Sequence, residues 1–130
     1  MESVLEFQNI SKYFPGVKAL DHVSFQAHSG EVLAFLGESG AGKSTLLKVL
    51  NGDYQPTSGK YLLDGVEKHF QSPHEAIEEG ISIIYQERQI LLELSVAENI
   101  YLGRMPVNRL GFIDTRKANE DAAKIIQDLK

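Results

Sequence analysis

The sequence predicts an α/β fold in which a parallel β core follows an antiparallel β region at the amino terminus. Three observations lead to this prediction. Apolar and polar residues alternate on both sides of a Pro-Gly turn within the first 30 residues, which is typical of two antiparallel strands. A short apolar run is then followed by a glycine-rich loop and an apolar helical pattern. A second apolar run, rich in isoleucine, follows a later helix and has the character of a buried parallel strand.

The antiparallel region is predicted for residues 1–30. Residues 4–10 alternate as Val-Leu-Glu-Phe-Gln-Asn-Ile, and residues 11–14 continue the strand. Pro15-Gly16 marks a turn, and residues 17–27 return as a second strand. His28-Ser29-Gly30 then turns the chain into the apolar run at residues 31–36, which we expect to be a short buried strand.

The glycine-rich loop reads Gly-Glu-Ser-Gly-Ala-Gly-Lys-Ser from Gly37 to Ser44 and matches the phosphate-binding pattern G-x-x-x-x-G-K-[ST]. Its glycines let backbone N–H groups approach phosphate oxygens closely. Lys43 is a flexible cation suited to the β- and γ-phosphates, and the Ser44 hydroxyl suits Mg²⁺. We therefore predict that a nucleotide is bound by Gly37, Ser39, Gly40, Ala41, Gly42, Lys43, Ser44 and Thr45.

The elements that follow the loop extend the predicted core to residue 94. A helix is expected at residues 44–50, ended by Asn51-Gly52. A strand at residues 60–63 and the hairpin signal Asp64-Gly65 precede a returning strand at residues 66–70. A capping box opens a helix to about residue 79, and the buried strand at residues 81–85 follows.

The last part of the chain, residues 95–130, is predicted to be helical. Before it, residues 87–94 are irregular and contain Ile90, Leu91, Leu92 and Leu94, which indicate incomplete packing or a partner surface. A second capping box at residues 95–98 opens a helix to about residue 102, and a loop spans residues 103–111. Asp114 or Thr115 caps a final helix, whose apolar face is Ala118, Ala122, Ile125, Ile126 and Leu129.

Two single residues each allow two interpretations. Tyr13 is either a core or edge-strand aromatic or a flat ring that stacks on adenine, and its place near a turn before the loop favours adenine. Gln86 follows a predicted parallel strand, where α/β sheets bind ligands, and its carbonyl suits Mg²⁺. An ordinary polar residue at a strand end explains Gln86 equally well.

The composition excludes several classes of function. The 130 residues carry a net charge of −5 without a basic stripe, so nucleic-acid binding is not expected. There is no cysteine, which excludes disulfides and thiolate chemistry, and the four histidines show no metal-ligand spacing. The start of the chain does not resemble a signal peptide, and no apolar run reaches the ~18 residues of a membrane helix, so we expect the chain itself to be soluble.

The loop, the upstream tyrosine and Gln86 together resemble the ATP-binding subunits of ABC transporters. The stretches Lys-Tyr-Phe-Pro-Gly-Val-Lys-Ala-Leu from Lys12 and Leu-Ser-Val-Ala-Glu-Asn-Ile-Tyr-Leu-Gly-Arg from Leu94 look like the simple-sugar importers of the ribose, galactose and xylose type. In those importers one polypeptide carries two nucleotide-binding domains. The chain then corresponds to the amino-terminal part of one such domain, a partial P-loop NTPase core.

This resemblance implies Mg-ATP as ligand and ATP hydrolysis that drives sugar import. Lys43 and Gln86 would serve catalysis, Ser44 and Gln86 would hold Mg²⁺, and the ring of Tyr13 would stack on adenine. The implied partners are membrane-spanning permease subunits, contacted by the region from Gln86 to Leu94, and a second nucleotide-binding domain. The implied location is peripheral, on the cytoplasmic face of the cell membrane.

The sequence also departs from the family pattern. It contains no Leu-Ser-Gly-Gly-Gln-type signature, no strand ending in Asp-Glu and no switch histidine, Arg88 stands where an apolar residue is common, and Glu38 stands where asparagine is usual. We therefore expect a fragment of a longer ATPase that is inactive alone and, because core strands are missing, marginally stable or self-associating. Three alternatives remain: a non-catalytic nucleotide-binding module, an ABC-type ATPase of translation or repair, and a P-loop kinase, for which the arginines show no suitable pattern.

Overall fold

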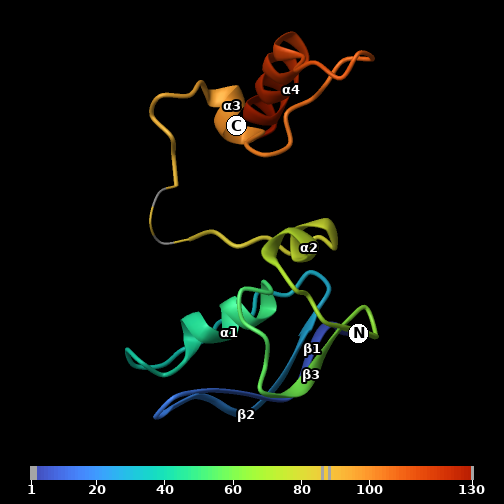
Figure 1. Cartoon of the computed structure of the whole chain (residues 1–130). Helices are drawn as coiled ribbons and strands as arrows, with labels where there is room; N and C mark the ends of the chain where they lie inside the picture. Colours follow the sequence, from blue (N-terminus) through green and yellow to red (C-terminus); the bar gives the residue numbers. More distant parts are fainter. Residues whose placement is uncertain (1–2, 86, 88, 130) are drawn as a thin grey trace. The chain divides into compact units, whose positions relative to one another are not determined.

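The computed structural model describes residues 3–85, 87 and 89–129, and the chain divides into two compact units, Met1–Ile84 and Tyr85–Lys130 (Figure 1). The first unit contains β1 (Ser3–Phe14), β2 (Val17–His28), α1 (Lys43–Leu50), β3 (Ser58–Leu63), β4 (Val66–Lys68) and α2 (Pro73–Glu78). The second unit contains α3 (Val96–Ile100) and α4 (Thr115–Asp128).

The first unit is built on an antiparallel sheet with the strand order β2-β1-β3-β4. The two predicted hairpins are confirmed. Pro15-Gly16 joins β1 to β2, and Asp64-Gly65 joins β3 to β4 with φ angles of 49° and 76°. Two successive positive φ angles are typical of a type I′ turn, whose backbone twist matches that of the two strands it joins.

Two residues with positive φ interrupt the β1–β2 ladder, and a serine on the opposite strand satisfies each of them. Asn9 has φ 50° and donates its backbone N–H to Ser24 Oγ at 2.8 Å. His22 has φ 49° and donates its N–H to Ser11 Oγ at 2.9 Å. Each hydroxyl takes the place of a backbone acceptor, so the long hairpin can bend at these positions while both N–H groups keep a partner.

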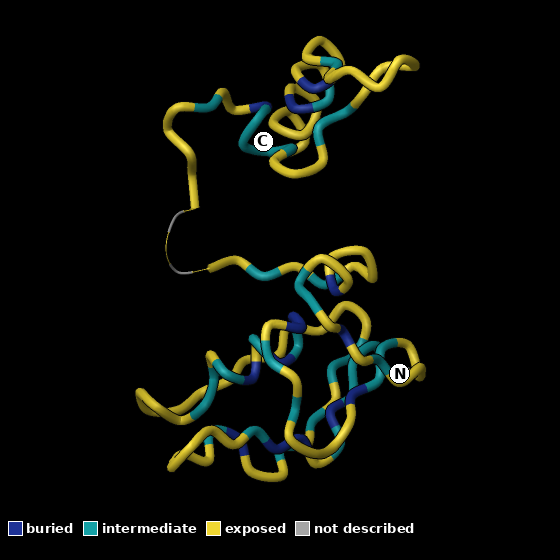
Figure 2. Tube along the Cα trace, in the orientation of Figure 1, coloured by how far each residue is buried: buried dark blue, intermediate teal, exposed yellow. Residues whose placement is uncertain are grey.

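The core of the first unit lies between the sheet and α1. Leu46 and Val49 of α1 are buried among apolar residues of the sheet, and Phe7 and Tyr61 place their ring centroids 5.4 Å apart. Figure 2 shows buried positions of this unit on the strands, on α1 and on α2. The cluster comprises Phe7, Ile10, Leu20, Leu46, Val49, Tyr61, Phe70 and Ala76.

The predicted parallel core is not formed among the described residues, so that part of the prediction is wrong for this structure. Residues 31–36 and 81–85 have no regular secondary structure and belong to no sheet. Val32, Leu36 and Ile84 are 96%, 93% and 98% exposed. A strand needs a neighbouring strand whose backbone forms hydrogen bonds with its N–H and C=O groups. No described segment pairs in this way with either run.

The second unit is a small helical unit in which Ala97 of α3 packs against Ala118 and Ala122 of α4. The capping box of α3 is complete, since Ser95 Oγ accepts the Glu98 N–H and Glu98 Oε2 accepts the Ser95 N–H. The helix ends at Ile100, two residues earlier than predicted.

Asp114, one of the two residues predicted to cap the final helix, is the N-cap of α4. Of its predicted apolar face, the two alanines are buried, whereas Ile125, Ile126 and Leu129 are exposed. Within the described parts of the chain, no helix has the length and apolar character needed to cross a membrane.

Candidate phosphate-binding site

The predicted loop connects the apolar run at residues 31–36 to α1, and its glycines allow the path that the backbone takes. Gly40 and Gly42 have φ angles of 85° and 90°, which residues with a side chain rarely adopt. Gly42 is the N-cap of α1, and its carbonyl accepts the first helical hydrogen bond, from the Leu46 N–H at 2.9 Å. The N–H groups of residues 43–45 precede that bond, and such groups at a helix start favour anions.

Gly42 is also required by a close approach between the loop and β2. A Cβ atom at this position would lie 2.3 Å from the Ala19 carbonyl oxygen and 3.1 Å from Leu20 Cδ2. Any side chain would therefore push the start of α1 away from the hairpin. The glycine therefore allows the loop to pack directly against the amino-terminal hairpin.

The loop and the tip of the β1–β2 hairpin enclose a hollow of about 440 Å³. The hairpin contributes Phe14, Val17, Lys18 and Ala19, and the loop contributes Ser39, Gly40, Gly42, Lys43, Ser44 and Thr45. The structure thus brings together six of the eight residues predicted for the loop. Gly37 and Ala41 do not line this hollow; they shape the loop, in which the Ala41 N–H bonds to Glu38 O at 3.1 Å.

Lys43 folds back over its own loop. Its Nζ donates to the carbonyl oxygens of Gly37 and Glu38, at 2.6 Å and 2.8 Å. These bonds hold the ammonium group beside the loop glycines and N–H groups that line the hollow. The Lys43 ammonium group is thus already positioned for a phosphate bound in the hollow. The phosphate oxygens would then replace the two carbonyl oxygens as acceptors of the ammonium hydrogen bonds.

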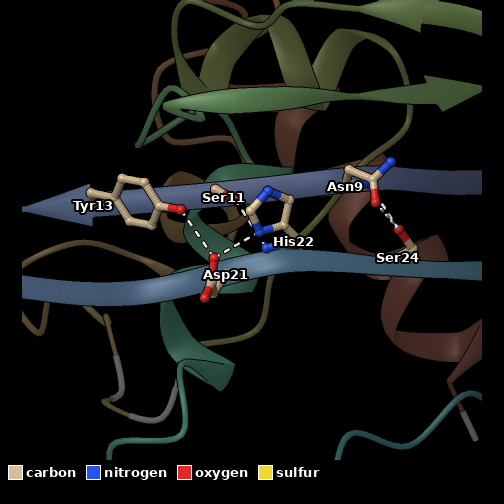
Figure 3. A network of polar contacts seen from close by, with 6 residues as sticks. All are labelled: Asn9, Ser11, Tyr13, Asp21, His22 and Ser24. Atoms are coloured by element: carbon tan, nitrogen blue, oxygen red, sulfur yellow. Dashed lines mark hydrogen bonds and ion pairs between the residues drawn. The ribbon is translucent and has the colours of Figure 1, made fainter.

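Tyr13 does not reach the hollow, contrary to its predicted position. Figure 3 shows its hydroxyl turned toward Asp21, to which it donates at 3.0 Å, and Lys18 Nζ lies 5.5 Å from its ring centroid. Hydrogen bonds from His22 and then from Tyr13 hold the pKa of Asp21 below its usual value. Tyr13 is therefore part of a polar cluster on the hairpin.

Phe14 is the aromatic residue that lines the hollow, and the sequence analysis missed it. Tyr13 pairs with Lys18 across the hairpin, whereas Phe14 pairs with Val17. Adjacent residues of a strand face opposite sides, so only one of two consecutive aromatics can face the loop. That alternation was the available signal, but it does not tell which aromatic faces the loop.

Few of the described residues at the hollow could ligate a metal ion, which is usual for Mg²⁺ that is bound together with a nucleotide. Mg²⁺ keeps several waters and usually takes one or two protein ligands together with phosphate oxygens. Ser44 lines the hollow and offers its hydroxyl. Gln86, the other predicted ligand, lies outside the described residues, as does Arg88. Among the residues that are described, no group of three or more His, Cys, Asp or Glu side chains could hold a metal on its own.

Comparison with known proteins matches nearly the whole chain to one protein family. The family described as "ABC transporter" matches residues 20–130. The arabinose import ATP-binding protein AraG of Vibrio parahaemolyticus is 53% identical over 127 residues, which cover 98% of this chain and 25% of that protein. The galactose/methyl galactoside import ATP-binding protein MglA of Fusobacterium nucleatum is 50% identical over 129 residues, which cover 99% of this chain and 26% of that protein.

Solved structures agree with this match. The ADP conformation of MJ1267, an ATP-binding cassette of an ABC transporter, gives a TM-score of 0.72 at 35% identity, over 79% of this chain and 41% of that one. A nucleotide-free ATP-binding cassette from an ABC transporter gives 0.71 at 33% identity, over 89% and 44% of the two chains. The chain spans about a quarter of the length of the curated relatives it matches.

Proposed function

This chain belongs to the ABC transporter family, and from that membership we propose that it binds Mg-ATP in the hollow between its glycine loop and its hairpin tip. The observation that carries the proposal is the convergence of Phe14 with six residues of the loop and the first turn of α1 on that one hollow. The lining thus combines hydrogen-bond donors suited to an anion with an aromatic ring.

The chemistry of each part matches one part of the nucleotide. The backbone N–H groups of residues 43–45 and the positive end of α1 suit the phosphates. Lys43 would move from its two carbonyl partners to phosphate oxygens, and Ser44 would ligate Mg²⁺. Phe14 and Val17, which pair at the hairpin tip, offer an apolar surface to the base.

For the whole protein we propose ATP hydrolysis that drives the import of a simple sugar. The relatives that support this role are named for the import of arabinose, ribose and galactose. The reaction needs a positioned water and compensation of the charge on the γ-phosphate. Lys43 would supply part of that compensation, and Gln86 would act on the water or the metal. We propose that this chain by itself does not turn over ATP.

The proposed partners follow from the same assignment. Permease subunits would contact the region from Gln86 to Leu94, in which Ile90, Leu91 and Leu92 are exposed. A second nucleotide-binding domain would close the opposite side of the nucleotide. The protein would then lie on the cytoplasmic face of the membrane, held there by its permease.

Ligand titration of the purified chain tests the binding proposal. We expect Mg-ATP and Mg-tripolyphosphate to bind, AMP to bind at least tenfold more weakly than ATP, and no phosphate to be released. Equal affinity for AMP and ATP would contradict phosphate binding at the loop. Release of phosphate by the chain alone would contradict its assignment as a catalytically incomplete part.

A further inference from the structure

Asn99 in α3 joins its helix to the segment that precedes it. Its Oδ1 accepts the Leu91 N–H at 2.9 Å, and its Nδ2 donates to the Leu91 carbonyl at 2.9 Å. Nδ2 also lies 3.2 Å from the Leu94 carbonyl and 3.0 Å from that of Ser95. The side-chain amide therefore exchanges two hydrogen bonds with one residue, as a strand partner does in an antiparallel pair.

These bonds close residues 91–95 into an ordered turn. The Leu94 N–H bonds to the Leu91 carbonyl at 3.2 Å, and Ser95 then caps α3 through its complete capping box. The Asn99 N–H bonds to the Ser95 carbonyl at 3.0 Å. These hydrogen bonds join the turn to residues 95–99 of the helix start. We call residues 95–99, together with Leu91 and Leu94, the Asn99 clasp.

The clasp displays apolar side chains. Ile90, which precedes the turn, is 58% exposed, and Leu91 and Leu92 within it are 44% and 88% exposed. Val96, in the first turn of α3, is 63% exposed. Without the clasp, these residues would sample many backbone conformations. A partner would then have to order them at the cost of conformational entropy, which a preformed surface avoids.

We propose that Asn99 is a positioning residue that holds this turn to α3, so that the permease docks on a preformed surface and moves turn and helix as one body. The inference rests on the proposed permease contact, with which the turn is continuous. The occupant is an apolar segment of the permease. Asn99 would act through its hydrogen bonds to the backbone of residues 91–95.

Amide hydrogen exchange in the present chain tests the clasp itself. Asn99→Ala removes the acceptor of the Leu91 N–H, so exchange at Leu91 should accelerate at least tenfold. Asn119→Ala, at an exposed position of α4, is the matched control and should leave Leu91 unchanged. An Asn99→Ala variant whose Leu91 exchange stays within twofold of the wild type would overturn the clasp.

Asn99→Asp provides a second variant if the alanine variant fails to fold. Aspartate keeps an acceptor for the Leu91 N–H but cannot donate to the three carbonyls. A carboxylate oxygen in place of Nδ2 would also be repelled by these carbonyl oxygens. The turn should therefore loosen, and exchange at Leu94, whose N–H bonds to the Leu91 carbonyl, should accelerate. Unchanged exchange at both amides would again overturn the clasp.

Coupling in the full-length protein assembled with its permease tests the positioning role. Asn99→Ala should lower the sugar transported per ATP hydrolysed at least threefold, with Mg-ATP affinity within twofold of the wild type. An unchanged ratio, with exchange at Leu91 accelerated, would reduce the clasp to a structural feature. A wild-type protein that does not assemble with a permease would overturn the proposed function instead, and the exchange result would stand apart from it.

Discussion

Gly42→Ala offers the most direct test of how the loop is built. The added Cβ would lie 2.3 Å from the Ala19 carbonyl oxygen, about 0.7 Å inside the 3.0 Å that real Cβ contacts keep, and the φ of 90° adds strain. A positive φ costs a residue with a side chain about 1–2 kcal/mol. Forcing a methyl group into a packed contact costs about 1–3 kcal/mol. The free energy of unfolding of the first unit should therefore fall by about 2–5 kcal/mol.

Gly40→Ala is the matched control for this prediction. Gly40 lies in the same loop with a φ of 85°, but a Cβ there would meet nothing within 4 Å. Its substitution should cost only the backbone strain, about 1–2 kcal/mol. Urea unfolding followed by circular dichroism measures both variants. Equal losses for the two variants would refute the close approach of the loop to Ala19.

Three further predictions follow from the described contacts. Phe14→Ala should weaken ATP more than tripolyphosphate by about 1–3 kcal/mol, the value of a base–aromatic stack, whereas Tyr13→Ala should weaken both little; a larger loss for Tyr13→Ala in competition titrations would contradict the hairpin geometry. Hydrogen bonds from Ser95 lower the pKa of Glu98, so its capping contribution is complete above its usual pKa of 4.5 and is lost as the pH falls through the lower folded value. In an NMR titration, Ser95 amide protection should weaken over that acidic range in the wild type but stay independent of pH in Glu98→Gln, whose neutral amide oxygen can still accept the Ser95 N–H; a variant that follows the wild-type curve would contradict the assignment. Because Val32, Leu36 and Ile84 are exposed, the chain should self-associate with rising concentration in analytical ultracentrifugation, and a strictly monomeric chain would contradict this expectation.

The local parts of the fold could be predicted because short-range signals determine them. Alternation and Pro15-Gly16 predicted the long hairpin, and the capping boxes predicted the starts of α2 and α3. The pattern from Gly37 to Ser44 placed the loop at the start of α1. In each case the signal is a turn, a cap or a motif whose own residues lie within a few positions of one another.

The parts that could not be predicted depend on neighbours that are distant in the chain. The apolar run at residues 31–36 has the composition of a strand, but a strand also requires a partner, which no described segment supplies. Tyr13 and Phe14 are equally aromatic, and only the register with Val17 and Lys18 separates them. The Asn99 clasp joins a side chain to backbone groups up to eight residues away, which leaves no periodic pattern in the sequence.

The central claim is that the loop from Gly37 to Thr45 binds the phosphates of Mg-ATP, and calorimetric titration of Lys43→Ala tests it most directly. Hydrogen bonds to charged groups contribute about 1.5–3 kcal/mol, so the variant should bind Mg-ATP about 10- to 150-fold more weakly than the wild type. Lys60→Ala on β3, whose ammonium lies 3.6 Å from a Glu67 carboxylate oxygen, is the control and should bind as the wild type does. A Lys43→Ala variant with unchanged affinity, or equal losses in both variants, would contradict nucleotide binding at this loop.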